Sequence, residues 1–90
     1  SSNLQKAKFF KTDLRNSLLS EANLEAAYLS SALMQGADLQ WANLNQAVLR
    51  YSVNLKPAQV QSAKIDRKTK IPQYLEIQWI SEDDFRCKKK

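Results

Sequence analysis

A large apolar side chain returns at every fifth residue through the first half of the chain. The ten positions are Leu4, Phe9, Leu14, Leu19, Leu24, Leu29, Met34, Leu39, Leu44 and Leu49. A small residue stands two positions before each of them, and these ten are Ser2, Ala7, Thr12, Ser17, Ala22, Ala27, Ala32, Ala37, Ala42 and Ala47. The other three positions of each unit are mostly polar. Few folds can accommodate such a period.

Neither an α-helix nor a flat strand places these residues on one face. Five residues turn a helix by about 500°, so successive large residues would lie about 140° apart. Side chains alternate along a strand, so an odd spacing would send successive leucines to opposite faces. What remains is a chain that bends once per unit and points both residues at a common axis. If four bends complete a winding of about twenty residues, windings can stack at roughly 4.8 Å and pair their backbone groups.

Several units resemble the A-(D/N)-L-x-x unit of the pentapeptide-repeat family. Examples are Ala22-Asn23-Leu24, Ala37-Asp38-Leu39 and Ala42-Asn43-Leu44. The resemblance covers residues 2–65. It implies an all-β fold, namely a right-handed quadrilateral β-helix of about three coils, similar to cyanobacterial members of the family. In many of those a Thr-bearing link, a proline and a Trp-bearing helix close the end of the coil.

The repeat frame shifts by one residue after Leu49. It resumes with Leu55, Val60 and Ile65 at the large position, and these three complete the predicted core. We place the extra residue within 50–52 and expect a bulge at a corner there. Two interpretations stay open: a loop that has drifted without a function, or a bulge that displays Tyr51.

The chain divides into a repeat domain (1–65), a C-terminal cap (66–81) and a flexible basic tail (82–90). Solenoids expose a sheet-like edge at each end, so a cap is expected. Pro72 suits the first turn of a helix, and apolar residues follow it, which predicts a short helix over 72–80 that covers the last coil. The predicted cap residues are Tyr74, Leu75 and Trp79, with a core role and no ligand.

The N-terminal end has no comparable cap, and the first residue lies inside the repeat pattern. Three explanations are open: truncation of a longer protein, end-to-end docking of a second copy, or a frayed edge. We favour truncation. No apolar run approaches the roughly 20 residues of a membrane span and no signal peptide is visible, so membrane insertion is not expected. The compartment is unknown, with the cytoplasm slightly favoured.

The residue inventory argues against an enzyme. The chain has no histidine and a single glycine, so it lacks the commonest general base and a glycine-rich phosphate loop. The acidic run 82–84 is expected to be solvated. The one cysteine, Cys87, cannot form an internal disulfide. We expect no catalytic residue, no metal, no cofactor and no small-molecule substrate.

Function is therefore expected to come from the side chains that the coil displays. Residues twenty apart should stack, which places Tyr28 over Val48 with Phe10 and Tyr51 diagonal to them. Aromatic residues with a basic rim are typical of interface centres. The candidate interface consists of Phe10, Tyr28, Val48, Arg50 and Tyr51. The alternative is that these are isolated exposed apolar residues, which are normal on protein surfaces.

The sequence predicts a non-catalytic protein-interaction scaffold or structural module, which we expect to be one part of a larger regulatory protein. Its expected partner is another protein. Some pentapeptide-repeat proteins mimic DNA and occupy DNA gyrase, but that role calls for an acidic rod and this chain carries a net charge of +5. A third alternative is weak, salt-dependent nucleic-acid binding through basic patches. Both alternatives are disfavoured.

Overall fold

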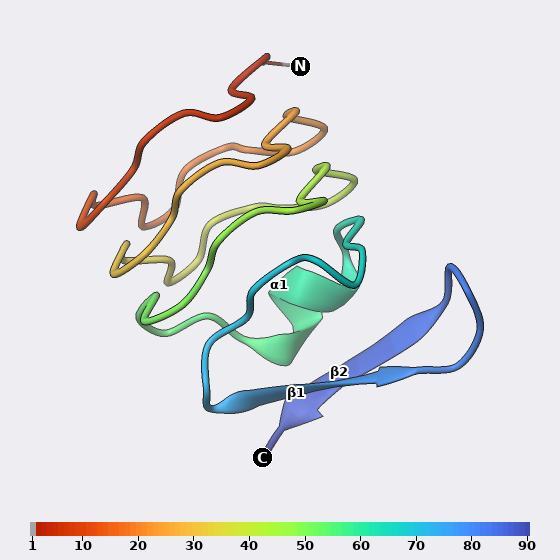
Figure 1. Cartoon of the computed structure of the whole chain (residues 1–90). Helices are drawn as coiled ribbons and strands as arrows, with labels where there is room; N and C mark the ends of the chain where they lie inside the picture. The colour runs from red at the N-terminus through yellow and green to blue at the C-terminus, as the bar shows by residue number, and fades with distance from the viewer. Residues whose placement is uncertain (1) are drawn as a thin grey trace.

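The computed structural model describes residues 2–90. Figure 1 shows the chain winding in stacked coils from the N-terminus towards a two-stranded hairpin at the C-terminal end. The elements are the helix α1 (Pro57–Gln61) and the strands β1 (Leu75–Trp79) and β2 (Phe85–Lys89). Isolated parallel bridges join the windings of the repeat segment. Within residues 2–90, this segment contains no strand longer than a single bridge.

Residues twenty positions apart pair between successive windings. The bridges of this spacing are Asn3–Asn23, Lys8–Tyr28, Asp13–Leu33, Leu18–Asp38, Asn23–Asn43, Tyr28–Val48 and Leu33–Val53. Each is flanked by two backbone hydrogen bonds. For example, the Leu4 N–H donates to the Asn23 carbonyl at 2.7 Å, and the Asn23 N–H donates to the Ser2 carbonyl at 2.8 Å. Each winding therefore provides hydrogen-bond partners for the backbone N–H and C=O groups of the winding before it.

The chain bends at every fifth residue, where the backbone φ angle is positive. These corner residues are Lys6, Lys11, Asn16, Glu21, Ala26, Ser31, Gly36, Trp41, Gln46 and Tyr51. At the first corner the Ala7 N–H donates to the Leu4 carbonyl at 3.0 Å, which closes a four-residue turn of the type II pattern. A left-handed conformation costs a residue other than glycine about 1–2 kcal/mol, so pairing between windings must offset that cost at nearly every corner.

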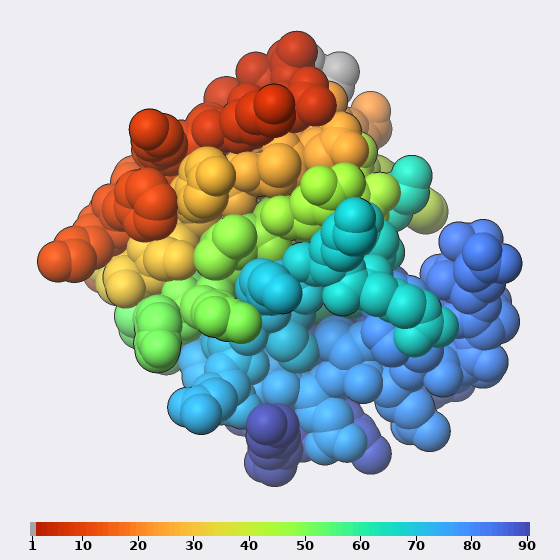
Figure 2. All heavy atoms as spheres, viewed as in Figure 1, coloured from red at the N-terminus to blue at the C-terminus, as the bar shows by residue number. Residues whose placement is uncertain are grey.

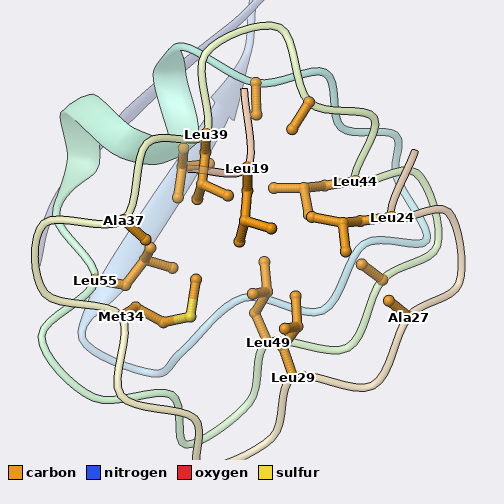
Figure 3. Close-up of a cluster of buried hydrophobic side chains, with 14 of the residues drawn as sticks. Leu19, Leu24, Ala27, Leu29, Met34, Ala37, Leu39, Leu44, Leu49 and Leu55 are labelled. Carbon is orange, nitrogen blue, oxygen red and sulfur yellow. The ribbon is translucent and has the colours of Figure 1, made fainter. Parts of the chain in front are cut away.

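The large and small residues of the repeat point into the coil (Figure 3). Six consecutive large residues are no more than 1% exposed, namely Leu24, Leu29, Met34, Leu39, Leu44 and Leu49. Leu14, Leu19, Leu55, Val60 and Ile65 are also buried. Leu4 and Phe9 are only partly buried and pack against this core, since the described residues place no further winding over them.

The extra residue of the repeat lies at Asn54, so the bulge predicted within 50–52 is wrong. Tyr51 is a regular corner with φ 64°, and Ser52 occupies the small inward position at 1% exposure. Val53 still pairs with Leu33 and is 40% exposed. Asn54 then turns the chain with φ 58°, which brings Leu55 inward. Asparagine visits the left-handed region more readily than most residues, and this favours position 54 for the insertion.

Helix α1 replaces the repeat unit that was expected to carry Val60 at its large position. Pro57 lies at the start of the helix, where its fixed φ and missing N–H fit well. The Lys56 N–H donates to Gln59 Oε1 at 2.7 Å and closes the first turn. Val60 nevertheless points to the core and is fully buried. The all-β prediction is therefore incomplete, although the inward position is occupied as the repeat requires.

A hairpin takes the place of the helix predicted over 72–80. Strand β1 pairs antiparallel with β2, with Ile77 opposite Cys87. Leu75 is buried and Ile77 and Trp79 are half-buried, whereas Glu76 and Gln78 are exposed. This alternation has the period of a strand with one covered face. The flexible tail predicted over 82–90 is likewise wrong for β2, because β2 supplies the partner that β1 needs.

Candidate aromatic interaction surface

One surface cluster joins Phe10, Tyr28 and Val48, which we call the aromatic strip. The ring centroids of Phe10 and Tyr28 lie 5.5 Å apart, and Tyr28 and Val48 are bridge partners in neighbouring windings. Phe10 is 52% exposed and Tyr28 is 39% exposed, while Val48 is half-buried. The ladder thus brings together three of the five predicted interface residues.

Lysines bracket the aromatic strip along the coil axis. Lys8 pairs with Tyr28 on the N-terminal side, and Lys70 pairs with Val48 on the C-terminal side. Both lysine side chains are exposed. Arg50 is exposed as well and follows Val48 by two residues, so its side chain lies on the same side of a short extended segment. The strip is therefore an apolar centre with a basic rim.

The structure places Tyr51 on a different surface from the aromatic strip. Tyr51 occupies the next corner, where it is 74% exposed. It lines a groove of about 770 Å³ together with Val53, Lys56 and Tyr74. Tyr51 was predicted to lie diagonal to Tyr28 and Val48; in the structure it faces a groove beside the C-terminal part of the chain.

The predicted cap residues lie in strand β1 or directly before it, at the end of the coil. Leu75 is 2% exposed. Trp79 packs against Phe85 at a centroid distance of 5.6 Å, and the Arg67 guanidinium lies 4.5 Å from its ring centroid. The Tyr74 hydroxyl donates to the Ser52 carbonyl at 2.7 Å and accepts from the Leu55 N–H at 3.0 Å. These two hydrogen bonds of Tyr74 therefore stabilise the segment in which the repeat frame shifts.

Polar side chains replace the backbone ladder where the last winding departs from the repeat. In the regular part, the Ala32 carbonyl accepts from the Val53 N–H at 2.8 Å, a separation of 21 residues. The matching donor for Ala37 would lie in α1, where the backbone is helical. The Gln59 Nε2 group takes this place and donates to the Ala37 carbonyl at 2.9 Å and to the Met34 carbonyl at 2.8 Å.

Two further side chains complete the last winding in the same way. The Gln46 N–H donates to Asp66 Oδ1 at 3.0 Å, and Thr69 Oγ1 donates to the Leu44 carbonyl at 2.9 Å. Sequence reasoning did not identify Gln59, Asp66 or Thr69. No five-residue signal marks them, because each replaces a bond that the repeat itself would have made.

A family model for pentapeptide repeats matches residues 12–50 with eight copies. The chain belongs to the pentapeptide-repeat family. Among solved structures, it is similar to the pentapeptide repeat protein Rfr23 from the cyanobacterium Cyanothece 51142, with 34% sequence identity and a TM-score of 0.66. That match covers 77% of this chain and 46% of the Rfr23 chain. A search of curated proteins found no match.

This pentapeptide-repeat chain also carries an ion pair on its coil. Arg15 Nη2 lies 2.7 Å from Asp13 Oδ2, and both side chains are 53% exposed. The hydrogen bond from the Arg15 guanidinium, followed by that from its backbone N–H, lowers the pKa of Asp13 from 3.8 to about 2. Asp13 therefore keeps its negative charge in mildly acidic solution. The pair itself carries no net charge.

Within the part of the chain that the structure describes, residues 2–90, no group of three or more His, Cys, Asp or Glu side chains is arranged to hold a metal ion. The same residues contain no helix of the length and apolar character that crossing a membrane requires. Cys87 is a free, half-buried thiol, and burial raises its pKa.

Proposed function

We propose that this pentapeptide-repeat chain is a non-catalytic protein-interaction module whose partner is another protein that docks on the aromatic strip. Membership of the family fits a non-catalytic repeat module. The single observation that carries the proposal is the pairing of two exposed aromatic rings, Phe10 and Tyr28, within 5.5 Å on one side of the coil. Clustered aromatic residues are typical of the energetic centre of an interface.

We further propose that the strip is held by a right-handed quadrilateral β-helix of about three coils, as the family implies. Corners at every fifth residue and bridges at every twentieth support four sides per winding. Such a coil fixes the spacing between Tyr28 and Val48 at the strand separation of about 4.8 Å. A pre-organised surface loses little side-chain and backbone freedom on binding, which suits a scaffold.

The basic rim indicates the charge of the partner. Lys8, Arg50 and Lys70 surround the apolar centre, and the whole chain has a net charge of +5. An acidic patch around an apolar contact would complement this arrangement and speed association. The same positive charge disfavours the DNA-mimic alternative, because a mimic of DNA must itself be acidic.

Replacing both Phe10 and Tyr28 with serine tests the proposal. The double variant should lose a specific partner in affinity capture, and the purified partner should bind it at least about tenfold more weakly, since central aromatic residues each contribute more than about 1 kcal/mol. The folding free energy should fall by no more than about 1.5 kcal/mol, because an aromatic pair contributes about 0.5–1.5 kcal/mol.

The matched control replaces Leu18 and Trp41 with serine. These side chains are 88% and 70% exposed, so they are more accessible than the strip, but they lie outside it. The control should retain the partner with unchanged affinity. Equal loss of binding in both double variants, or unchanged binding in the Phe10 and Tyr28 variant, would contradict the proposal.

A further inference from the structure

The groove of about 770 Å³ that Tyr51 lines lies where the C-terminal hairpin meets the segment in which the repeat frame shifts; we call it the Tyr51 groove. Its lining consists of the segment 51–56 together with Gln35, Tyr74, Lys89 and Lys90. In Figure 2 the blue residues of the hairpin lie directly below the green residues of the last regular winding. The groove therefore brings together side chains that lie far apart in the sequence.

All charged side chains that line the Tyr51 groove are lysines, namely Lys56, Lys89 and Lys90. They are exposed, and the single ion pair within residues 2–90 contains none of them. In the 90-residue chain Lys90 also carries an α-carboxylate, so the lining residues hold three positive charges and one negative charge. The groove therefore keeps a net positive charge at neutral pH, which favours an anionic ligand.

The acidic side chains beside the Tyr51 groove have basic neighbours of their own. Glu76 lies opposite Lys88 in the hairpin. Asp13, which lines an adjoining hollow with Gln35, is bonded to Arg15. Neither carboxylate lines the groove, so its positive charge is left in place.

Lys56 and Lys89 reach the groove from different elements. Lys56 directly precedes α1. Lys89 lies opposite Leu75 in the hairpin, and residues directly opposite each other share one face of a sheet. Because Leu75 is buried in the core of the coil, Lys89 is on the face of the hairpin that looks towards the coil. Two cations from separate segments thus converge on one groove.

Tyr51 and Tyr74 give the groove exposed aromatic surface. Tyr51 is 74% exposed and Tyr74 is 42% exposed. The hydrogen bonds of the Tyr74 hydroxyl with the main chain of Ser52 and Leu55 hold its ring in place. The aromatic contacts found within residues 2–90 involve neither ring. Both rings can therefore stack with a flat aromatic group of a ligand.

The size of the Tyr51 groove suits a small ligand. Its volume of about 770 Å³ lies within the range of roughly 300–1,000 Å³ that is usual for small-molecule sites. A stable protein interface takes about 20–30 residues from each partner, whereas ten residues line this groove. The occupant that matches the charge, the aromatic surface and the volume is a small anion with a flat ring.

We propose that the Tyr51 groove binds a free nucleotide. The phosphate groups meet Lys56 and Lys89, since a lysine ammonium group is a compact point charge that binds phosphate well. The base stacks on the exposed tyrosine rings, as bases do on aromatic side chains in nucleic-acid sites. The ligand is bound and not transformed. This site lies apart from the aromatic strip and does not depend on it.

Adenosine diphosphate is the probe, titrated into the whole 90-residue chain, with adenosine and pyrophosphate as matched controls. Amide nitrogen–proton spectra should show the largest shifts over 51–56 and at Lys89. Adenosine lacks the phosphates and should bind at least about tenfold more weakly, because hydrogen bonds to charged groups are the strong ones. Pyrophosphate lacks the base and should also bind at least about tenfold more weakly, because the stacking is lost.

Two protein variants separate the groove from the overall charge of the chain. Lys56→Gln combined with Lys89→Gln should weaken binding of adenosine diphosphate at least about tenfold. Lys6→Gln combined with Lys11→Gln removes the same charge from two exposed corners outside the groove, and Gln46 shows that such a corner accepts glutamine. This control should change the affinity by no more than about twofold, because distant exposed charges are screened.

Equal weakening by the two lysine pairs would overturn the proposal, since it would indicate attraction by net charge alone. Pyrophosphate or adenosine binding as tightly as adenosine diphosphate would overturn it too. So would largest shifts at Phe10 and Tyr28. Tighter binding of a decathymidylate strand, or of a peptide that alternates tyrosine and glutamate, at the same residues would assign the groove to a single-stranded nucleic acid or to an acidic protein segment and would also contradict a free nucleotide.

Discussion

Replacing Leu44 with alanine should lower the free energy of unfolding by about 3–4 kcal/mol. Leu44 is 0% exposed and lies in the stack of inward residues, and large-to-small changes at such sites cost about 2–5 kcal/mol because a cavity remains. Small domains have a total stability of only about 5–15 kcal/mol. The change should therefore bring the protein close to unfolding, as measured by chemical denaturation.

Leu4→Ala provides the matched control for Leu44→Ala. Leu4 occupies the same position of the repeat but is only partly buried at the open end of the coil. Its loss should cost about 1 kcal/mol, since less apolar surface is returned to water. Equal destabilisation by the two changes would show that both ends of the coil are covered alike and would contradict the arrangement described above.

Changing Gln59 to leucine should cost about 1–3 kcal/mol, although leucine is the better residue for burial. The change removes the donor for the Ala37 carbonyl and the acceptor for the Lys56 N–H. A buried polar group left without a partner costs about 1–3 kcal/mol. Thermal and chemical denaturation of the purified variant measure the loss.

Gln40→Leu is the control for Gln59→Leu. Gln40 is exposed, so the same chemical change there should alter stability by no more than about 0.5 kcal/mol. Gln59→Glu adds a second comparison, because a carboxylate keeps the acceptor for Lys56 but cannot donate to the Ala37 carbonyl. If Gln59→Glu were as stable as the parent protein, the proposed replacement of a backbone donor by this side chain would be wrong.

The five-residue period was sufficient to predict which side chains turn inward. A spacing of two between the small and the large residue places both on one face of a short extended segment, and Ala27 and Leu29 are both 0% exposed. The stacking of Tyr28 on Val48 follows from the same period. Both features follow from a local geometry that is the same in every unit, so they can be predicted from a single sequence.

The hairpin could not be predicted in the same way, because strand β2 does not resemble the five-residue repeat. The apolar residues from Ile71 to Trp79 fit a helical face, and Pro72 suits a helix start. The same residues also fit the alternation of inward and outward side chains in a strand. The strand forms because β2 places Phe85 opposite Trp79 and Cys87 opposite Ile77. Strand pairing depends on both segments, and the lysine-rich β2 gives little local indication of a strand.

The insertion at Asn54 illustrates a second kind of error. From the repeat alone, Val53 fits the small inward position as well as Ser52 does. The structure buries Ser52 and exposes Val53 to 40%. The Ser52 hydroxyl donates to the Leu49 carbonyl at 2.7 Å, which satisfies it inside the coil. A choice between two frames one residue apart depends on such bonds, and composition does not reveal them.

Backbone contacts between residues twenty apart test the coil most directly. In nuclear Overhauser spectra of the purified chain, the backbone protons around Tyr28 should contact those around Lys8 and Val48, in the pattern of parallel strands. Helical contacts between residues three and four apart throughout 2–50, with no cross-peaks between Tyr28 and Val48, would contradict the stacked coil and every surface derived from it.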